Sequence, residues 1–237
     1  MAAMARSWGA HVAVRRLSGL QTWWRPALGV ALLGSLAAMA PVRAAPPGIA
    51  ERPAAQATAP SADVRALHAA IVRTRDHQGL PFALIDKRAA TLHVYDANGH
   101  LLDSSAVLLG QALGDDSVPG IGDRPLRDIR PHERTTPAGR FVSEPGVNLQ
   151  GEDIVWIDYE AAVSLHRLRP VHAAQRRVQR LASASAEDKR ITYGCVNVPH
   201  AFYERYLAPV FGRQRALVYV LPEQRPLAQV FAPLLAP

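Results

Sequence analysis

The stretch TYGCVN, residues Thr192–Asn197, holds Cys195, the only cysteine of a 237-residue chain. A single thiol has no partner for an internal disulfide. An exposed thiol is a liability in an oxidising compartment, so it needs either burial or a chemical use. Cys195 follows a glycine in a segment predicted to turn from a strand into a helix, which suits a nucleophile. The competing interpretation is a small buried apolar residue, the commoner fate of a lone cysteine.

The first 44 residues have the pattern of a secretory signal peptide. Arginines from Arg6 to Arg25 precede an uncharged apolar stretch, Pro26–Ala40. Val42-Arg43-Ala44 then supplies small residues at the two positions that a signal peptidase reads, which predicts cleavage after Ala44. The apolar stretch is shorter than the roughly 20 residues of a membrane span, so a retained N-terminal anchor is the second choice. We expect an exported protein, periplasmic or associated with the cell wall, with no stable membrane insertion after cleavage.

Removal of this segment changes the charge balance. The whole chain has 27 basic and 20 acidic residues, a net charge of +7. The first 44 residues hold five arginines and no acidic residue, so 22 basic and all 20 acidic residues remain, a net charge of +2. That balance does not indicate a partner made of nucleic acid. We expect a monomer with one domain of sizeable core.

Composition and periodicity divide the rest of the chain. Residues 45–60 are rich in Pro and Ala, which is typical of a flexible linker. Ser61 can cap a helix that runs from about 62 to 76. The predicted parts are a signal peptide (1–44), a linker (45–60), an N-terminal helix (61–79), a main domain (80–222) and a C-terminal tail (223–237).

The main domain reads as mostly β. Two runs of β-forming residues, 82–86 and 91–95, lead to the sequence DANG at 96–99, a strong hairpin signal. Residues 111–134 form a long charged loop without periodicity, and such loops are usually functional or mobile. Further strands are expected at 101–109, after the turn at 136–141, at 153–157, at 162–166 and at 216–221, with a helix or ordered insertion at 169–180 and a helix opened by Pro199. These elements predict an α+β fold with a β-sandwich or barrel-like sheet and one or two packed helices.

A cysteine nucleophile needs a nearby base to take its proton. The candidate bases are His166, His172 and His200, while His93, His100 and His132 lie further away in sequence. His166 stands at the end of a predicted strand, where catalytic groups are often presented. The sequence contains no metal-ligand cluster of usual spacing and no phosphate-binding glycine loop, so we expect neither a metal nor a cofactor.

Four segments in order resemble a known family. TYGCVN is similar to the Ser/Thr-His-Gly-Cys-apolar-Asn/Arg signature of L,D-transpeptidases of the YkuD type. The hairpin over residues 85–99 resembles the opening hairpin of that family, and Thr136–Phe141 resembles its Thr-Pro-x-Gly-x-Phe element. The strand Val163–His166 resembles the strand that bears its catalytic histidine. The resemblance covers residues 80–222 and implies a YkuD-like β-sandwich or barrel as the catalytic domain.

The resemblance implies a cysteine enzyme that acts on the stem peptides of peptidoglycan. His166 would deprotonate Cys195, whose thiolate would attack a stem tetrapeptide, release its terminal D-Ala and form a thioester. An amine of a neighbouring stem, or water, would then resolve the thioester. The backbone N–H groups of Tyr193, Gly194 and Cys195 would stabilise the oxyanion. Gly194 allows close approach because it lacks Cβ.

Two departures from the family pattern concern the site. The histidine that precedes Gly-Cys in the family is Tyr193 here, whose phenol can still donate a hydrogen bond. The 25 residues between His166 and Thr192 form a longer gap than usual in the family, and His172 would shorten it. We favour His166 because His172 lies in the basic insertion rather than at a strand end.

The candidate substrate-binding residues are Thr192, Asn197 and Arg190. Hydrogen bonding within the turn is the competing role for Thr192 and Asn197, and a solvated surface position is the competing role for Arg190. Thr136 and Gly139 are expected to be structural. Two other functions stay open: an L,D-carboxypeptidase or hydrolase of the same fold, and a non-catalytic cell-wall-binding module. A third interpretation is purely structural, with Cys195 as a buried core residue.

Overall fold

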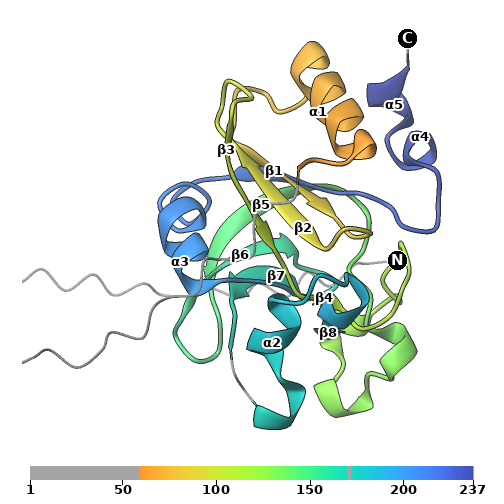
Figure 1. Ribbon diagram of the computed structural model, residues 1–237, viewed down its shortest axis with the longest axis vertical. Helices are drawn as coiled ribbons and strands as arrows, with labels where there is room; N and C mark the ends of the chain where they lie inside the picture. Colours follow the sequence, from red (N-terminus) through yellow and green to blue (C-terminus); the bar gives the residue numbers. More distant parts are fainter. Residues whose placement is uncertain (1–58, 170–171, 237) are drawn as a thin grey trace, which may run out of the picture. The chain divides into compact units, whose positions relative to one another are not determined.

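The computed structural model describes residues 59–169 and 172–236 (Figure 1). The predicted signal peptide and all but the last two residues of the predicted linker lie outside these ranges. No helix within the described ranges is long and apolar enough to cross a membrane.

An eight-stranded sheet forms the centre of the fold. Its strand order is β3-β2-β1-β10-β5-β6-β7-β9, and its two edges meet at a bridge between Leu108, just after β3, and Asn197 of β9. The pairs β1–β10 and β7–β9 are parallel and the other pairs are antiparallel. The strands are β1 (Phe82–Asp86), β2 (Thr91–Tyr95), β3 (Leu101–Ala106), β5 (Gly139–Val147), β6 (Asp153–Asp158), β7 (Val163–Arg167), β9 (Val196–Val198) and β10 (Ala216–Val220). The predicted class, α+β and mostly β with a barrel-like sheet, is confirmed.

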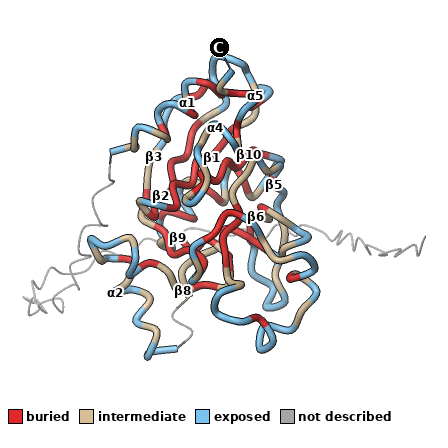
Figure 2. Tube along the Cα trace, turned by 90° about the vertical axis from the view of Figure 1, so that its right-hand side faces the viewer, coloured by how far each residue is buried: buried red, intermediate tan, exposed pale blue. Residues whose placement is uncertain are grey.

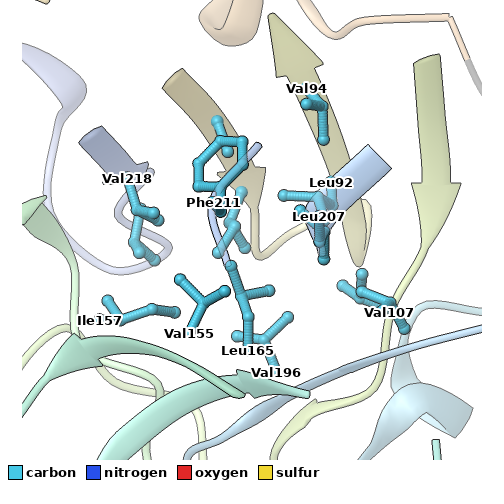
Figure 3. Packing of buried hydrophobic residues seen from close by; sticks show 14 of the residues in the cluster. Leu92, Val94, Val107, Val155, Ile157, Leu165, Val196, Leu207, Phe211 and Val218 are labelled. Carbon is cyan, nitrogen blue, oxygen red and sulfur yellow. The ribbon is translucent and has the colours of Figure 1, made fainter. Parts of the chain in front are cut away.

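The central strands are buried on both faces, which explains their nearly continuous apolar sequences. In β1, Ala83 and Ile85 pack into one hydrophobic cluster, whereas Phe82 and Leu84 pack into a second one on the opposite face. This division follows from the two-residue period of a strand. Figure 2 shows the buried residues concentrated along these strands. Figure 3 shows residues of the first cluster, contributed by several strands and by the segment after β9, turned toward one another.

The second cluster is covered by both ends of the described chain. Helix α1 (Ala62–Thr74) is capped by Ser61, whose side chain accepts a hydrogen bond from Val64 N at 3.3 Å. Two short helices, α4 (Leu227–Val230) and α5 (Ala232–Leu235), follow the last strand and lie beside α1 (Figure 1). Phe231 belongs to this cluster and is 2% exposed. The segment expected as a C-terminal tail therefore includes part of the core.

Three other segments differ from the sequence expectation. The strand expected at 101–109 ends at Ala106, and only the last expected residue belongs to β4 (Leu109–Gly110), which pairs with β8 (Arg190–Thr192) in a separate two-stranded sheet. The 111–134 loop contains three single-turn 3-10 helices, η1 (Ile121–Asp123), η2 (Leu126–Asp128) and η3 (Pro131–Glu133). The insertion after β7 contains η4 (Ala173–Gln175), α2 (Arg177–Leu181) and η5 (Glu187–Lys189).

Cys195 lies in a turn between two strands, β8 and β9. The strand β9 separates Cys195 from the following helix, α3 (His200–Phe202), which continues into a π-helical turn, η6 (Tyr203–Leu207). The expectation of a strand-to-helix turn at Cys195 was therefore wrong. Pro199 does precede the first turn of the helix, as expected.

Candidate active site

The register of two parallel strands determines which side chains meet Cys195. His166 of β7 is the pairing partner of Asn197 of β9, and Leu165 pairs with Val196. Because side chains alternate along a strand, Ser164 and His166 share one face of β7. On the neighbouring segment, which leads into β9, the side chains of Cys195 and Asn197 lie on the same face of the sheet. Leu165 and Val196 point into the core.

The Cys195 thiol is half-buried between polar groups of the β7 segment. Its Sγ lies 3.6 Å from Ser164 Oγ and 3.6 Å from the carbonyl oxygen of Ala162. Burial opposes ionisation of the thiol, but the interaction with the His166 imidazole and hydrogen bonds from Ser164 outweigh it and lower the pKa of Cys195. A lowered pKa makes more thiolate available at neutral pH, and thiolate is the nucleophilic form.

The hydrogen bonds of His166 determine which ring nitrogen can act as a base. Nδ1 lies 2.8 Å from the carbonyl oxygen of Arg167, which can only accept, so Nδ1 carries the proton. Nε2 is therefore unprotonated, and its electron pair accepts a hydrogen bond from Asn197 Nδ2 at 3.0 Å. The orientation of the Asn197 amide follows from Arg177, whose Nη1 donates to Asn197 Oδ1 at 2.9 Å. The histidine thus has the tautomer that a general base for Cys195 needs.

Hydrogen bonds inside the turn hold the backbone around Cys195. Thr192 Oγ1 donates to the carbonyl oxygen of Cys195 at 2.7 Å and accepts from Gly194 N at 3.1 Å. Thr136 Oγ1 donates to the carbonyl oxygen of Gly194 at 2.8 Å and accepts from Gly110 N at 2.9 Å. Thr192 and Thr136 are both buried. Thr192 therefore holds the turn rather than facing a substrate, and Thr136 has the structural role expected of it.

Gly194 is required by its backbone conformation and by a close neighbour. Its φ is +134°, a value that L-residues rarely adopt, and a Cβ there would lie 2.7 Å from the carbonyl oxygen of Thr135. Its N–H is already engaged by Thr192. The expectation that this N–H stabilises an oxyanion was therefore wrong. Across the described ranges, the N–H groups of Tyr193 and Cys195 donate to no protein group, so those two remain available.

Tyr193 packs against the 111–134 loop. The guanidinium carbon of Arg134 lies 4.0 Å from the centroid of the Tyr193 ring. Arg134 is itself anchored, because Nη2 and Nε both donate to the carbonyl oxygen of Ile129. Tyr193 thus connects the turn that holds Cys195 to that loop, and no described side chain bonds to its hydroxyl.

Arg190 is turned inward rather than toward solvent or a substrate. Its side chain is 10% exposed and forms an ion pair with Glu223. Nη2 also donates to the carbonyl oxygen of Lys87 at 2.8 Å. Because both terminal nitrogens bond inside the protein and the side chain is largely buried, neither the predicted binding role nor the surface alternative agrees with the structure.

The other candidate histidines interact with groups other than Cys195, or with none that is described. His172 is exposed in the insertion, and no described interaction joins it to Cys195. His200 is exposed and lies 3.7 Å from Glu204. His93 is buried and its ring contacts the hydroxyls of Thr91 and Ser104. His166 is thus the candidate base that the structure brings to the thiol.

Two residues near Cys195 were missed by the sequence reasoning, Ser164 and Arg177. Ser164 could have been found from the strand period, since it stands two residues before His166. Arg177 belongs to a basic stretch without a clear pattern, so nothing in its spacing indicated a role. A pocket of about 310 Å³ is lined by residues 115–120, by three residues in or just before β5 and by residues at and after the end of β6, and neither Cys195 nor His166 lines it. The described ranges contain no cluster of three or more metal-ligating side chains.

No protein-family model and no curated protein matches the chain. Among solved structures, it is similar to the L,D-transpeptidase LdtMt1 in complex with imipenem, at 17% identity and a TM-score of 0.38, over 60% of this chain and 58% of that one. It is similar to the helical cell shape determining protein Pgp2 from Campylobacter jejuni at 18% identity and a TM-score of 0.40, over 62% of this chain and 49% of that one. It is similar to the catalytic domain of the E. faecium L,D-transpeptidase at 17% identity and a TM-score of 0.34, over 61% of this chain and 99% of that one. The chain thus spans about half the length of the first two proteins, and its structural neighbours include L,D-transpeptidase catalytic domains.

Proposed function

We propose that this protein is an exported L,D-transpeptidase-like acyltransferase that uses Cys195 as its nucleophile on peptidoglycan stem peptides. The observation that carries the proposal is the pairing of β7 with β9, which sets a thiol of lowered pKa beside a histidine of the required tautomer. The substrate class comes from the resemblance of TYGCVN and the three upstream segments to the family signature.

In the first half-reaction, His166 Nε2 gives up the hydrogen bond from Asn197 Nδ2 and takes the proton from Cys195 Sγ. The thiolate attacks the carbonyl carbon before the terminal D-Ala. The N–H groups of Tyr193 and Cys195 donate to the oxygen that becomes negative. The tetrahedral intermediate collapses when the C–N bond breaks, and the leaving amine takes the proton from the imidazolium. The products are free D-Ala and a thioester on Cys195.

In the second half-reaction, an amine of another stem attacks the thioester and His166 takes a proton from it. The thiolate leaves, and an amide bond joins the two stems. Water in place of the amine gives a free tripeptide, which is the carboxypeptidase alternative.

Product analysis tests the proposal and separates its alternatives. The purified protein would be incubated with stem tetrapeptides, beside the Cys195→Ala variant, and the products identified by mass. We expect free D-Ala and cross-linked dimers with the unaltered protein and neither with Cys195→Ala. Free tripeptides without dimers would assign the carboxypeptidase reaction instead. Binding of the peptides with no release of D-Ala would contradict an enzyme and favour the wall-binding module.

A further inference from the structure

Arg177 brings a cation to the candidate active site from the insertion between β7 and β8. It opens helix α2, and its side chain is half-buried. Its Nε donates to Gln175 Oε1 at 2.7 Å and its Nη1 donates to Asn197 Oδ1 at 2.9 Å. Asn197 in turn donates to His166 Nε2, so one amide separates this guanidinium from the base.

The guanidinium of Arg177 lacks the acidic partner that other partly or largely buried arginines of this protein have. Arg167 pairs with Asp153 and Glu204, and Arg190 pairs with Glu223. Over residues 59–169 and 172–236, no carboxylate lies within ion-pair distance of Arg177, and no hydrogen bond from its Nη2 is formed. Burial lowers the pKa of Arg177, while the nearby Cys195 thiolate opposes that effect. A partly desolvated cation without a counterion is costly, and a bound anion would offset that cost.

We propose that Arg177 binds a carboxylate of the substrate beside the Cys195–His166 pair. This identification rests on the proposed function: the carboxylate is the terminal one of the leaving D-amino acid. His166 must protonate the leaving amine, so this nitrogen lies next to the imidazole. The carboxylate is joined to the carbon that bears the same nitrogen, which places it toward Asn197 and Arg177. A guanidinium can hold a carboxylate through two parallel hydrogen bonds.

This assignment makes the insertion a specificity element. A stem peptide that ends at the leaving residue presents a carboxylate to Arg177. A peptide that continues beyond that residue, or ends in an amide, presents a neutral group instead. The protein should therefore select stems that end one residue after the scissile bond.

Alkylation of Cys195 tests the anion site without any peptidoglycan substrate. Iodoacetate and iodoacetamide deliver the same carbon to the thiol, but only iodoacetate carries a carboxylate. We expect the ratio of their rate constants, iodoacetate over iodoacetamide, to fall about tenfold in Arg177→Gln, the size of one charge-assisted hydrogen bond. Arg176→Gln is the matched control, because Arg176 is the exposed neighbour, and its ratio should stay as in the unaltered protein.

The ratio also separates anion binding from a purely positioning role through Asn197. If Arg177 only oriented Asn197 and His166, both reagents would slow equally, and an unchanged ratio in Arg177→Gln would overturn the proposal. Arg177→Lys keeps the charge and should retain most of the ratio. Should Arg177→Gln fail to fold, the unaltered protein still decides the matter. Its ratio should exceed that of glutathione and fall with added salt, and a ratio equal to that of glutathione would overturn the proposal.

A second measurement links the anion site to the substrate. The unaltered protein should release D-Ala from a stem tetrapeptide at least about tenfold faster than D-alaninamide from the amidated peptide, and Arg177→Gln should lose this difference. Equal rates with both peptides in the unaltered protein would overturn the assignment. Absence of turnover with both peptides, together with the Arg177-dependent alkylation ratio, would contradict the proposed function and leave the anion site supported.

Discussion

At the scale of single residues, the candidate site depends on side chains that alternate along two parallel strands. Ser164 and His166 belong to β7. Asn197 belongs to β9, and Cys195 directly precedes that strand. A shift of β9 by one residue in this register would move Cys195 and Asn197 to the core side, away from Ser164 and His166. The pairing of Leu165 with Val196 in the core therefore fixes how His166 and Cys195 lie relative to each other.

The first prediction concerns the pH dependence of the thiol. The rate of alkylation by iodoacetamide should rise with pH to a plateau, with a midpoint below the value of about 8.5 for an ordinary cysteine. His166 favours the thiolate, so His166→Ala should raise the midpoint because burial is then less opposed. His172→Ala serves as the control and should leave the midpoint unchanged. An unshifted midpoint in His166→Ala would exclude His166 as the partner of Cys195.

The residue-level predictions from sequence succeeded where a short motif carries its own geometry. Gly194 is such a case for the expected close approach, because a Cβ there would lie 2.7 Å from the carbonyl oxygen of Thr135. Arg190 is the opposite case, since its ion pair with Glu223 joins residues far apart in sequence. Arg177 could not be found for the same reason: its contact with Asn197 depends on how the insertion folds back over β9.

At the scale of elements, a buried ionic network joins the end of β1 to the loop after β4 and to the segment after β10. Lys87 is fully buried and its Nζ donates to Asp115 Oδ1 at 2.8 Å and to the carbonyl oxygen of Thr136 at 3.0 Å. Asp115 also accepts from the backbone N–H groups of Glu223 and two residues that follow it. Through Thr136, this network supports the turn that carries Gly194.

The second prediction concerns this network. Lys87→Met should lower the free energy of unfolding by about 3–5 kcal/mol, because it leaves buried carboxylates without their central cation. Arg88→Met removes the neighbouring cation, whose side chain is 55% exposed, and should cost less than about 1 kcal/mol. Urea unfolding measures both variants. Equal effects of the two substitutions would contradict a stabilising role of the buried network.

The third prediction gives the pH dependence of the same network. Burial raises the pKa of the Asp115 carboxyl, but Lys87 and the backbone donors outweigh this and hold that pKa well below its usual range. The carboxylate therefore contributes fully above its unfolded-state pKa of about 4, and the contribution is lost as the pH falls below that value. The unaltered protein should lose stability between about pH 5 and pH 2 more steeply than Lys87→Met. Parallel losses in the two proteins would show that Asp115 is not the source.

At element scale, the sequence predicted strands and helices whose periodicity is local. The hairpin of β1 and β2 was found from its alternation and its DANG turn, and α1 from its cap. The boundary between β3 and β4 was not found, because it depends on which distant strand each segment pairs with: β4 pairs with β8. The helices α4 and α5 are only four residues each and contain or follow a proline, so they show no helical period.

At the scale of the whole described domain, the sheet and its closure bring the site together. The bridge between Leu108 and Asn197 joins the two edges of the sheet at the strand that follows the nucleophile. One cluster fills the inside of this sheet, and the second, under α1 and α5, covers the outer face of β1, β2 and β10. The sequence predicted the class of this architecture. It did not predict the contact between the two sheet edges that positions Asn197, because that contact joins residues 108 and 197, which are 89 positions apart in the chain.

The central claim is that Cys195 forms a covalent acyl-enzyme, and the mass of the intact protein after incubation with imipenem tests it most directly. The protein should gain the mass of one imipenem, and digestion should locate the adduct on the peptide that contains Thr192–Asn197. Cys195→Ala should gain none, whereas His172→Ala should react as the unaltered protein does. The account would be contradicted if the adduct persisted in Cys195→Ala, or if no adduct formed in a protein whose Cys195 reacts readily with iodoacetamide.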